Sequence, residues 1–222
     1  MDLDKLVKKI YTSRKTVLEL LNDRGYPTDK YNNYTINEIS TMIKTTHRLV
    51  SGLNPLPGPL DILLTREDGR KIYVKYNLDI SRLTAVIKTM NHEIFDKVID
   101  KKDTLLLLVA GKFNITTATV TTYIDKMYYS DGCFIQMFNV AHLLFNRSKH
   151  EIVPKHRIIS EKEKRQVMKR YNMSSVDNFP MILKEDAIAK YYGCRPGDIC
   201  EITSHSGISG SYVKYRHCIS SI

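Results

Sequence analysis

The sequence lacks most of the patterns that indicate a bound metal, a nucleotide or a membrane anchor. Its four cysteines, Cys133, Cys194, Cys200 and Cys218, form no CxxC pair and have no histidine at zinc-ligand spacing, which argues against a zinc site and a disulfide framework. No glycine-rich loop has Walker or Rossmann spacing, and no apolar run is long enough to span a bilayer. The start, Met1-Asp2-Leu3-Asp4, does not resemble a secretion signal. We therefore expect an intracellular protein with reduced thiols and no cofactor.

Positive charge is the main compositional feature of the chain. The 222 residues include 34 Lys and Arg against 24 Asp and Glu, a formal net charge of +10. Residues 1–146 contribute 20 − 16 = +4 and residues 147–222 contribute 14 − 8 = +6, so the shorter C-terminal part is the more basic. An excess of this kind favours contact with nucleic acid or with an acidic protein surface, although most charged faces are simply solvated.

The first part of the chain reads as helices alternating with strands. Apolar residues at helical spacing predict a helix from about residue 4 to residue 24, and Thr35-Ile36-Asn37-Glu38 is a capping box that opens a second helix. Residues 60–65 and 71–76 are predicted to pair as a hairpin through Asp68-Gly69. Further helices are expected over 81–91 and from Asn114 or Thr116 to Met127, with strands over 104–110 and 133–138. This pattern predicts an α/β domain over residues 1–146.

A second folding unit is expected to begin after residue 146. Pro154 ends any preceding helix, and Ser160-Glu161-Lys162-Glu163 has the form of another capping box. We expect helices over about 160–171 and 185–192, a turn at Arg195-Pro196-Gly197-Asp198, and strands over 199–203 and 212–216. Residues 147–222 are therefore predicted to form a small α+β module.

One pattern suggests an enzyme. Asp61 followed across the hairpin by Lys75 resembles the acidic-then-lysine hairpin of restriction-endonuclease-like nucleases, which hold a divalent cation with paired carboxylates. Tyr73 stands where the second carboxylate is needed, and tyrosine is a poor magnesium ligand. The alternative is a hairpin with an exposed lysine and an aspartate in a turn. A nuclease-like core without an active site is compatible with both observations.

His150 and His156 flank an apolar pair and Pro154. Two histidines this close together raise the hypothesis of a metal site. No third or fourth ligand follows at suitable spacing. We interpret these histidines as structural or interface residues. A basic helix bearing Lys162, Lys164, Arg165, Lys169 and Arg170 suits nucleic acid in charge, but no aromatic or base-reading motif accompanies it.

Three segments of the C-terminal part carry a resemblance to a known family. They are His150-Glu151-Ile152-Val153-Pro154-Lys155-His156, Asp186 to Asp198, and Ser209-Gly210-Ser211-Tyr212-Val213-Lys214-Tyr215-Arg216. In order and spacing they resemble the fifth subunit shared by the eukaryotic nuclear RNA polymerases, whose C-terminal half corresponds to a small subunit of the archaeal polymerase. Ser13 to Val17 and Asn22 to Tyr26 are similar to the opening helix of the eukaryotic protein.

The resemblance implies a non-catalytic subunit that docks on the largest polymerase subunit through its C-terminal assembly module. The N-terminal domain is then a jaw domain with a restriction-endonuclease-like core, part of the lower jaw beside downstream duplex DNA. The implied partner-binding residues are His150, Val153, Pro154, His156, Tyr192, Gly193, Arg195, Gly197, Tyr212, Tyr215 and Arg216. The implied DNA-proximal residues are Lys112, Asn114, Thr116 and Thr117. Phosphate contacts there position a duplex without reading its sequence.

The chain departs from the family pattern in three places, one of which is Lys162, where an acidic residue is expected before Glu163. Thr116-Thr117-Ala118 replaces the usual Pro-Ser-Ala, and Ser204-His205-Ser206-Gly207-Ile208 replaces an Arg-Pro-Ser-Glu-Thr run, so contacts of that arginine and glutamate do not carry over. These departures and the richness in Lys, Ile, Tyr and Asn suggest a distant member from a large eukaryotic DNA virus. Its location is then the nucleus, or the host cytoplasm and virion. The remaining alternatives are a nuclease using Asp61 and Lys75, and a free regulatory or DNA-binding protein.

Overall fold

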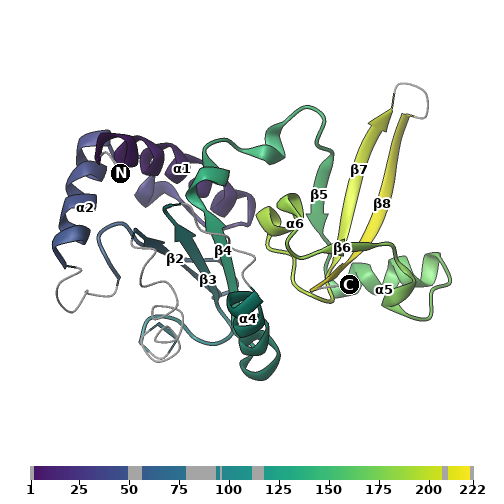
Figure 1. The fold of residues 1–222 in the computed structure, drawn as a ribbon. Helices are drawn as coiled ribbons and strands as arrows, with labels where there is room; N and C mark the ends of the chain where they lie inside the picture. Colours follow the sequence, from purple (N-terminus) through teal and green to yellow (C-terminus); the bar gives the residue numbers. More distant parts are fainter. Residues whose placement is uncertain are drawn as a thin grey trace. The chain divides into compact units, whose positions relative to one another are not determined.

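A computed structural model of the chain describes residues 3–49, 57–78, 94–95, 97–111, 118–206 and 210–220. The chain divides into two compact units, Met1–Phe145 and Asn146–Ile222, drawn from purple to teal and from green to yellow in Figure 1. No helix in these described ranges combines the length and apolar character needed to cross a membrane.

The first unit begins with two amphipathic helices, α1 (Leu3–Asp23) and α2 (Ile36–Leu49). Gly25 adopts a positive φ of 83° directly after α1, and its N–H donates to Asn22 O at 2.8 Å. The predicted capping box at the start of α2 is confirmed. Thr35 N donates to Glu38 Oε2 at 2.7 Å, and Glu38 N donates to Thr35 Oγ1 at 3.3 Å.

A four-stranded sheet forms the centre of the first unit, in the order β1-β2-β3-β4. The strands are β1 (Ile62–Thr65), β2 (Lys71–Asn77), β3 (Thr104–Val109) and β4 (Phe134–Asn139). The predicted hairpin is confirmed, since β1 and β2 pair antiparallel, while β2, β3 and β4 run parallel. Every residue of β3 and β4 is buried, which requires cover on both faces of the sheet.

Helices supply that cover. Helix α4 (Ala118–Asp131) packs Val120 and Met127 against one face, in a core that includes Leu105 and Ile135. On the other face, Arg24 after α1 donates to Gln136 Oε1 at 2.8 Å. The chain leaves β4 through a 3-10 turn at Val140–Leu143. The helix predicted over residues 81–91 lies outside the described residues.

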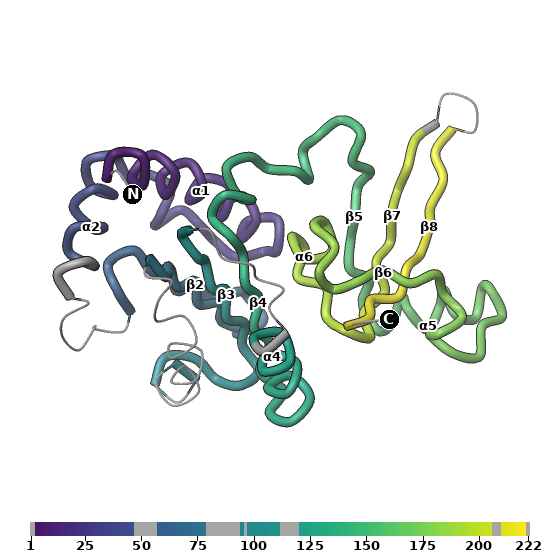
Figure 2. Tube along the Cα trace, in the orientation of Figure 1, coloured from purple at the N-terminus to yellow at the C-terminus, as the bar shows by residue number. Residues whose placement is uncertain are grey.

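The second unit contains a separate four-stranded sheet in the order β5-β7-β8-β6. The strands are β5 (Lys155–Ile158), β6 (Met181–Leu183), β7 (Ile199–Ser206) and β8 (Gly210–Ile219). The two long strands form an antiparallel hairpin that extends past β5 and β6 (Figure 2). β6 runs parallel to β8 and pairs with it only opposite residues 217–219.

Each face of the second sheet is covered by one helix. Helix α5 (Glu161–Arg170) contributes Val167 to a core with Ile199, and helix α6 (Ala187–Tyr192) contributes Ala189 to a core with Cys200. The expected capping box at the start of α5 and the expected helix end at Gly193 are both present. The two mixed helix-and-strand units agree with the coarse fold class expected from sequence, but the sequence analysis assigned no strand to β5 or β6.

Candidate docking surface in the second unit

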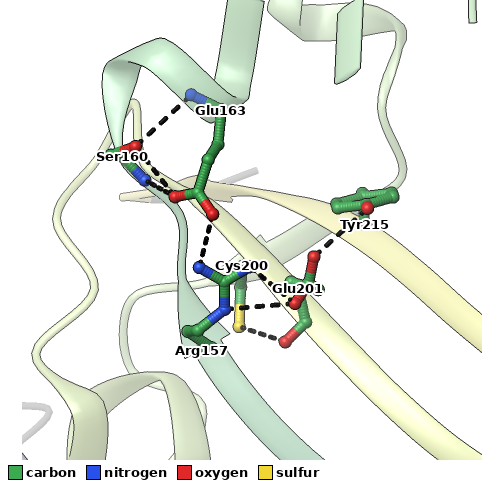
Figure 3. Close-up of polar contacts among 6 residues, drawn as sticks. All are labelled: Arg157, Ser160, Glu163, Cys200, Glu201 and Tyr215. Atoms are coloured by element: carbon green, nitrogen blue, oxygen red, sulfur yellow. Dashed lines mark hydrogen bonds and ion pairs between the residues drawn. The ribbon is translucent and has the colours of Figure 1, made fainter. Parts of the chain in front are cut away.

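A row of paired residues crosses the sheet beneath α5. Because β5 and β8 both pair with β7, Arg157, Glu201 and Tyr215 stand opposite one another on three adjacent strands. The Arg157 guanidinium donates to Glu201 Oε1 from Nη2 at 2.9 Å, and the Tyr215 hydroxyl donates to Glu201 Oε2 at 3.2 Å. Figure 3 shows this row. Tyr215 is therefore held within the unit.

Arg157 also reaches the first turn of α5. Its Nη1 donates to Glu163 Oε1 at 2.7 Å, while Glu163 Oε2 accepts from Ser160 N and Oγ, both at 2.8 Å (Figure 3). The hydrogen bond from Arg157 is the largest cause that lowers the carboxyl pKa of Glu163 to about 2, followed by the bonds from Ser160. Burial raises the pKa of Tyr215, and its bond to Glu201 adds to that rise.

The opposite face carries a ring pair at its junction with α6. His156 and Tyr192 stack with ring centroids 6.4 Å apart and an interplanar angle of 16°. His156 Nδ1 lies 2.7 Å from Pro154 O, and because a carbonyl oxygen only accepts, Nδ1 carries the hydrogen in this contact. Tyr191, next to Tyr192, accepts a hydrogen bond from Asn146 Nδ2 at 2.9 Å.

The loop before this ring pair is compact and mostly exposed. Val153 N donates to His150 O at 2.9 Å, and Ile152 N donates to His150 Nδ1 at 3.3 Å. Ile152 is 84% exposed, the largest fraction among the exposed large apolar residues. The two histidines thus hold backbone geometry. Within the described ranges, no three His, Cys, Asp or Glu side chains are arranged to hold a metal ion.

The predicted turn after α6 forms around the half-buried Asp198. Gly193 has φ 77° and Gly197 has φ 98°, both in the left-handed region that favours glycine. Arg195 N donates to Asp198 Oδ2 at 2.7 Å. Burial raises the carboxyl pKa of Asp198, against the lowering effect of that hydrogen bond. Gly197 N donates to Cys218 O at 2.9 Å, which ties the turn to β8.

The remaining expected contact residues lie on β8. Tyr212 is 37% exposed, with Lys214 Nζ 4.8 Å from its ring centroid. Arg216 is exposed and donates to Met181 O at 2.9 Å. Because side chains alternate along a strand, Tyr212, Lys214 and Arg216 share one face, and Tyr215 points to the other.

The predicted partner-binding residues therefore lie on two different faces of the sheet. His156 stands opposite Ile202, and Ile202 stands opposite Lys214, so His156 shares its face with Tyr212 and Arg216. We call this face of the second unit, represented by His156, Tyr192, Tyr212 and Arg216, the α6-side face. Sequence reasoning missed Arg157 and Glu201, whose pairing depends on the register of β5 with β7.

The residues of the nuclease-like pattern lie in the first unit, and they are engaged in structural contacts. Asp61 Oδ2 accepts from Gly58 N at 2.7 Å and from the Tyr73 hydroxyl, and Asp61 Oδ1 accepts from Tyr76 N at 3.3 Å. Lys75 Nζ lies 4.0 Å from Asp61 Oδ2, and the two side chains are only 19% and 5% exposed. The expectation of an exposed lysine was therefore wrong.

Tyr73 excludes water from this contact. It is fully buried, and burial raises its pKa, with a further rise from the neighbouring Asp61 carboxylate. The Tyr73 hydroxyl is protonated and donates to Asp61, at the position where a bound cation would need a second carboxylate. The contact between Asp61 and Tyr73 therefore stabilises the hairpin. The expected DNA-proximal residues, Lys112, Asn114, Thr116 and Thr117, lie outside the described residues.

Comparison with known proteins connects this architecture to transcription. Residues 145–218 match the family model described as RNA polymerase Rpb5, C-terminal domain. The DNA-directed RNA polymerases IV and V subunit 5B of Arabidopsis thaliana is 25% identical to this chain, over 96% of this chain and 90% of the relative's length. The DNA-directed RNA polymerases I, II, and III subunit RPABC1 of Caenorhabditis briggsae is 24% identical over 94% of both chains. The Dictyostelium discoideum subunit rpabc1 is 36% identical over 38% of this chain and 43% of its own.

Proposed function

The chain belongs to the family of the fifth subunit of eukaryotic RNA polymerases, and from this premise we propose that it docks on the largest polymerase subunit and forms part of the lower jaw beside downstream DNA. Its relatives are named as fifth subunits of RNA polymerases, and this chain is likewise a non-catalytic subunit of a polymerase complex. The finer assignment divides the two roles between the two units.

The second unit is proposed as the assembly module. The observation that carries this proposal is the family match over residues 145–218, which covers nearly all of the compact unit Asn146–Ile222. The α6-side face supports it, because the face places a stacked ring pair and an exposed tyrosine beside cationic Lys214 and Arg216. Aromatic and arginine side chains are enriched at protein interfaces. Tyr215 is assigned a supporting role from the opposite face.

The first unit is proposed as the jaw domain. Two relatives align with 94% or more of this chain, so their similarity includes this unit. Its parallel strands covered by helices, together with an Asp61 and Lys75 pair that is committed to packing, support a nuclease-like core without its chemistry. Lys112, Asn114, Thr116 and Thr117 remain the proposed residues for sequence-independent phosphate contacts.

The proposed location follows the polymerase. For a cellular source this is the nucleus, and for a large DNA virus it is the nucleus or the host cytoplasm and virion. The nuclease alternative has no support, because the Asp61 carboxylate is filled by structural donors and the relatives are polymerase subunits. A free regulatory protein would be recovered without any polymerase subunit.

Affinity purification of the full chain from its native source tests docking. We expect the largest polymerase subunit to co-purify with the wild type, and Tyr212→Ser with Arg216→Gln to reduce its recovery at least tenfold. Val213→Ser is the matched control, because Val213 is 45% exposed on the same strand but on the other face. Recovery that is equal in both variants would assign the dock to another surface. A purification with no polymerase subunit would contradict the function itself.

A further inference from the structure

Helix α1 presents a lysine face that the fold does not use. Its apolar residues, including Leu6 and Ile10, are buried. Lys5, Lys8 and Lys9 are exposed, as is Lys15 two turns further on. At about 100° per residue, the four lysines fall within a sector of about 120° around the helix axis. We call these four residues the α1 lysine face.

No acidic residue occurs between Lys5 and Lys15, and the acids of α1 stand near its ends, at Asp4, Glu19 and Asp23. Among the described residues, none of the four lysines takes part in an ion pair. Lys15 Nζ lies 4.7 Å from the centroid of the Tyr11 ring, so that lysine keeps its charge at the surface beside an aromatic ring. The face is therefore a concentration of four positive charges, with Asp4 and Glu19 as the acids of α1 that stand four residues from Lys8 and Lys15.

Helix stability does not account for this arrangement. Lys5 lies in the first turn of α1, beside the positive end of the helix dipole, where anions are favoured. Lys5 is also three residues from Lys8 and four from Lys9, and like charges at these spacings destabilise a helix. Lys5 and Lys9 thus oppose the helix that carries them, which points to an external anion.

Helix α5 provides the contrast. Its acids, Glu161 and Glu163, are in the first turn, and Lys169 and Arg170 are in the last turn. This order complements the helix dipole. Lys164 pairs with Glu161 at 3.4 Å. Apart from Lys162, the cations of α5 are therefore accounted for by contacts or positions within their own helix.

We propose that the α1 lysine face binds the phosphate backbone of duplex DNA, as a contact of the jaw unit in addition to residues 112–117. This inference rests on the proposed function, which supplies the nucleic acid. From Lys5 to Lys15 the helix rises about 15 Å, which spans about four phosphates of one strand at 3.4 Å each. Lysines act as point charges toward phosphate. The contact is therefore independent of base sequence.

An acidic protein segment fits the face less well. Protein interfaces bury an apolar centre within a polar rim, and the exposed positions among the lysines supply only Thr12 and a half-buried Tyr11. A polyanion with regularly spaced charges requires no apolar centre. Duplex DNA meets this requirement.

Binding of the full chain to a labelled duplex of about 20 base pairs, measured by fluorescence anisotropy across a salt series, tests the proposal. We expect the variant Lys5→Gln, Lys8→Gln, Lys9→Gln, Lys15→Gln to flatten the slope of log K against log salt by about 3 to 4. Four phosphate contacts correspond to an affinity loss of roughly 10²-fold for wild type between 50 and 200 mM salt, which the variant should not show.

The matched control removes the same charge from α5, through Lys162→Gln, Arg165→Gln, Lys169→Gln and Arg170→Gln. Its slope should stay within about 1 of the wild type. If the slope of log K against log salt flattens equally in both variants, the effect depends only on net charge and the proposal is overturned. An unchanged slope in the α1 variant would also overturn it. Binding that depends on α1 with polyglutamate but not with duplex would assign the face to an acidic protein. Polymerase co-purification is scored separately, so its failure is distinguishable.

Discussion

Arg157 donates two hydrogen bonds to a single carboxylate oxygen of Glu201, from Nε at 3.1 Å and from Nη2 at 2.9 Å. The pair depends on the antiparallel register in which these residues stand opposite each other on β5 and β7. The same guanidinium bonds to Glu163, and through it a short edge strand is linked to the helix that follows. We expect this link to be visible in the pH dependence of stability.

Arg157→Gln should weaken the pH dependence of stability in acid. The carboxyl pKa of Glu163 is about 2 in the folded chain, against an ordinary value of 4.5. A lowered pKa stabilises the folded state above pH 4.5, and this stabilisation is lost as the pH falls toward 2. Without Arg157 the folded pKa rises toward its ordinary value. Urea unfolding at several pH values measures the change, and Arg165→Gln on the exposed side of α5 is the control. Superimposable pH profiles for wild type and Arg157→Gln would contradict the assignment.

Ser160→Ala should destabilise the second unit by about 1 kcal/mol, because it removes the acceptor for Glu163 N and half of the capping box. Ser160→Gly should lose only a few tenths of a kcal/mol, since glycine is well tolerated at this position. Chemical unfolding followed by circular dichroism compares the two variants. Equal losses would mean that the hydroxyl contributes little.

Asp61→Ala should lower the free energy of unfolding by about 3 kcal/mol, because buried donors from Gly58, Tyr73 and Tyr76 lose their acceptor. Tyr73→Phe removes only one donor and should cost about 1 kcal/mol. Incubation of the wild type with duplex DNA and magnesium should give no cleavage. Magnesium-dependent cleavage that disappears in Asp61→Ala without a loss of stability would restore the nuclease hypothesis.

The four thiols should be unreactive in the folded chain. Cys133, Cys194, Cys200 and Cys218 are buried and free. Hydrogen bonding with Cys200 and Cys218, followed by burial, raises the pKa of Cys194, whereas the hydrogen bond from Cys194 lowers the pKa of Cys200. Since a reagent must reach the sulfur before it can react, burial should prevent a thiol reagent from labelling any of these residues until the chain is unfolded. Rapid labelling of one thiol at native conditions would indicate local opening at that residue.

Local signals in the sequence predicted the parts of the fold that depend on neighbouring residues. The capping residues Ser160 and Thr35 act on backbone groups within one helical turn, and the turn at Asp68-Gly69 joins adjacent strands. The continuous apolar sequence of β3 predicted that both faces of this strand are buried, as they are. These features need no knowledge of the tertiary arrangement.

Features set by distant pairing escaped prediction. β5 has alternating exposed and half-buried residues, and β6 is three residues long, so neither shows a hydrophobic pattern before β7 and β8 are placed beside it. The division of Tyr212 and Tyr215 between two faces follows from strand alternation, but only the register with β7 shows what each one meets. Asp61 looked catalytic because sequence alone does not show that Tyr73 and Tyr76 point donors at it.

The short overlap of β6 with β8 affects the solubility of the isolated chain. Within the described strands, β6 covers β8 only at residues 217–219, so the outer edge of β8 from Gly210 to Arg216 offers unpaired amides and carbonyls. Open strand edges of this kind are templates for self-association. Lys214 and Arg216 lie along this edge, and like charges on approaching copies repel one another. The solubility of the free protein should therefore decline as salt screens these two side chains.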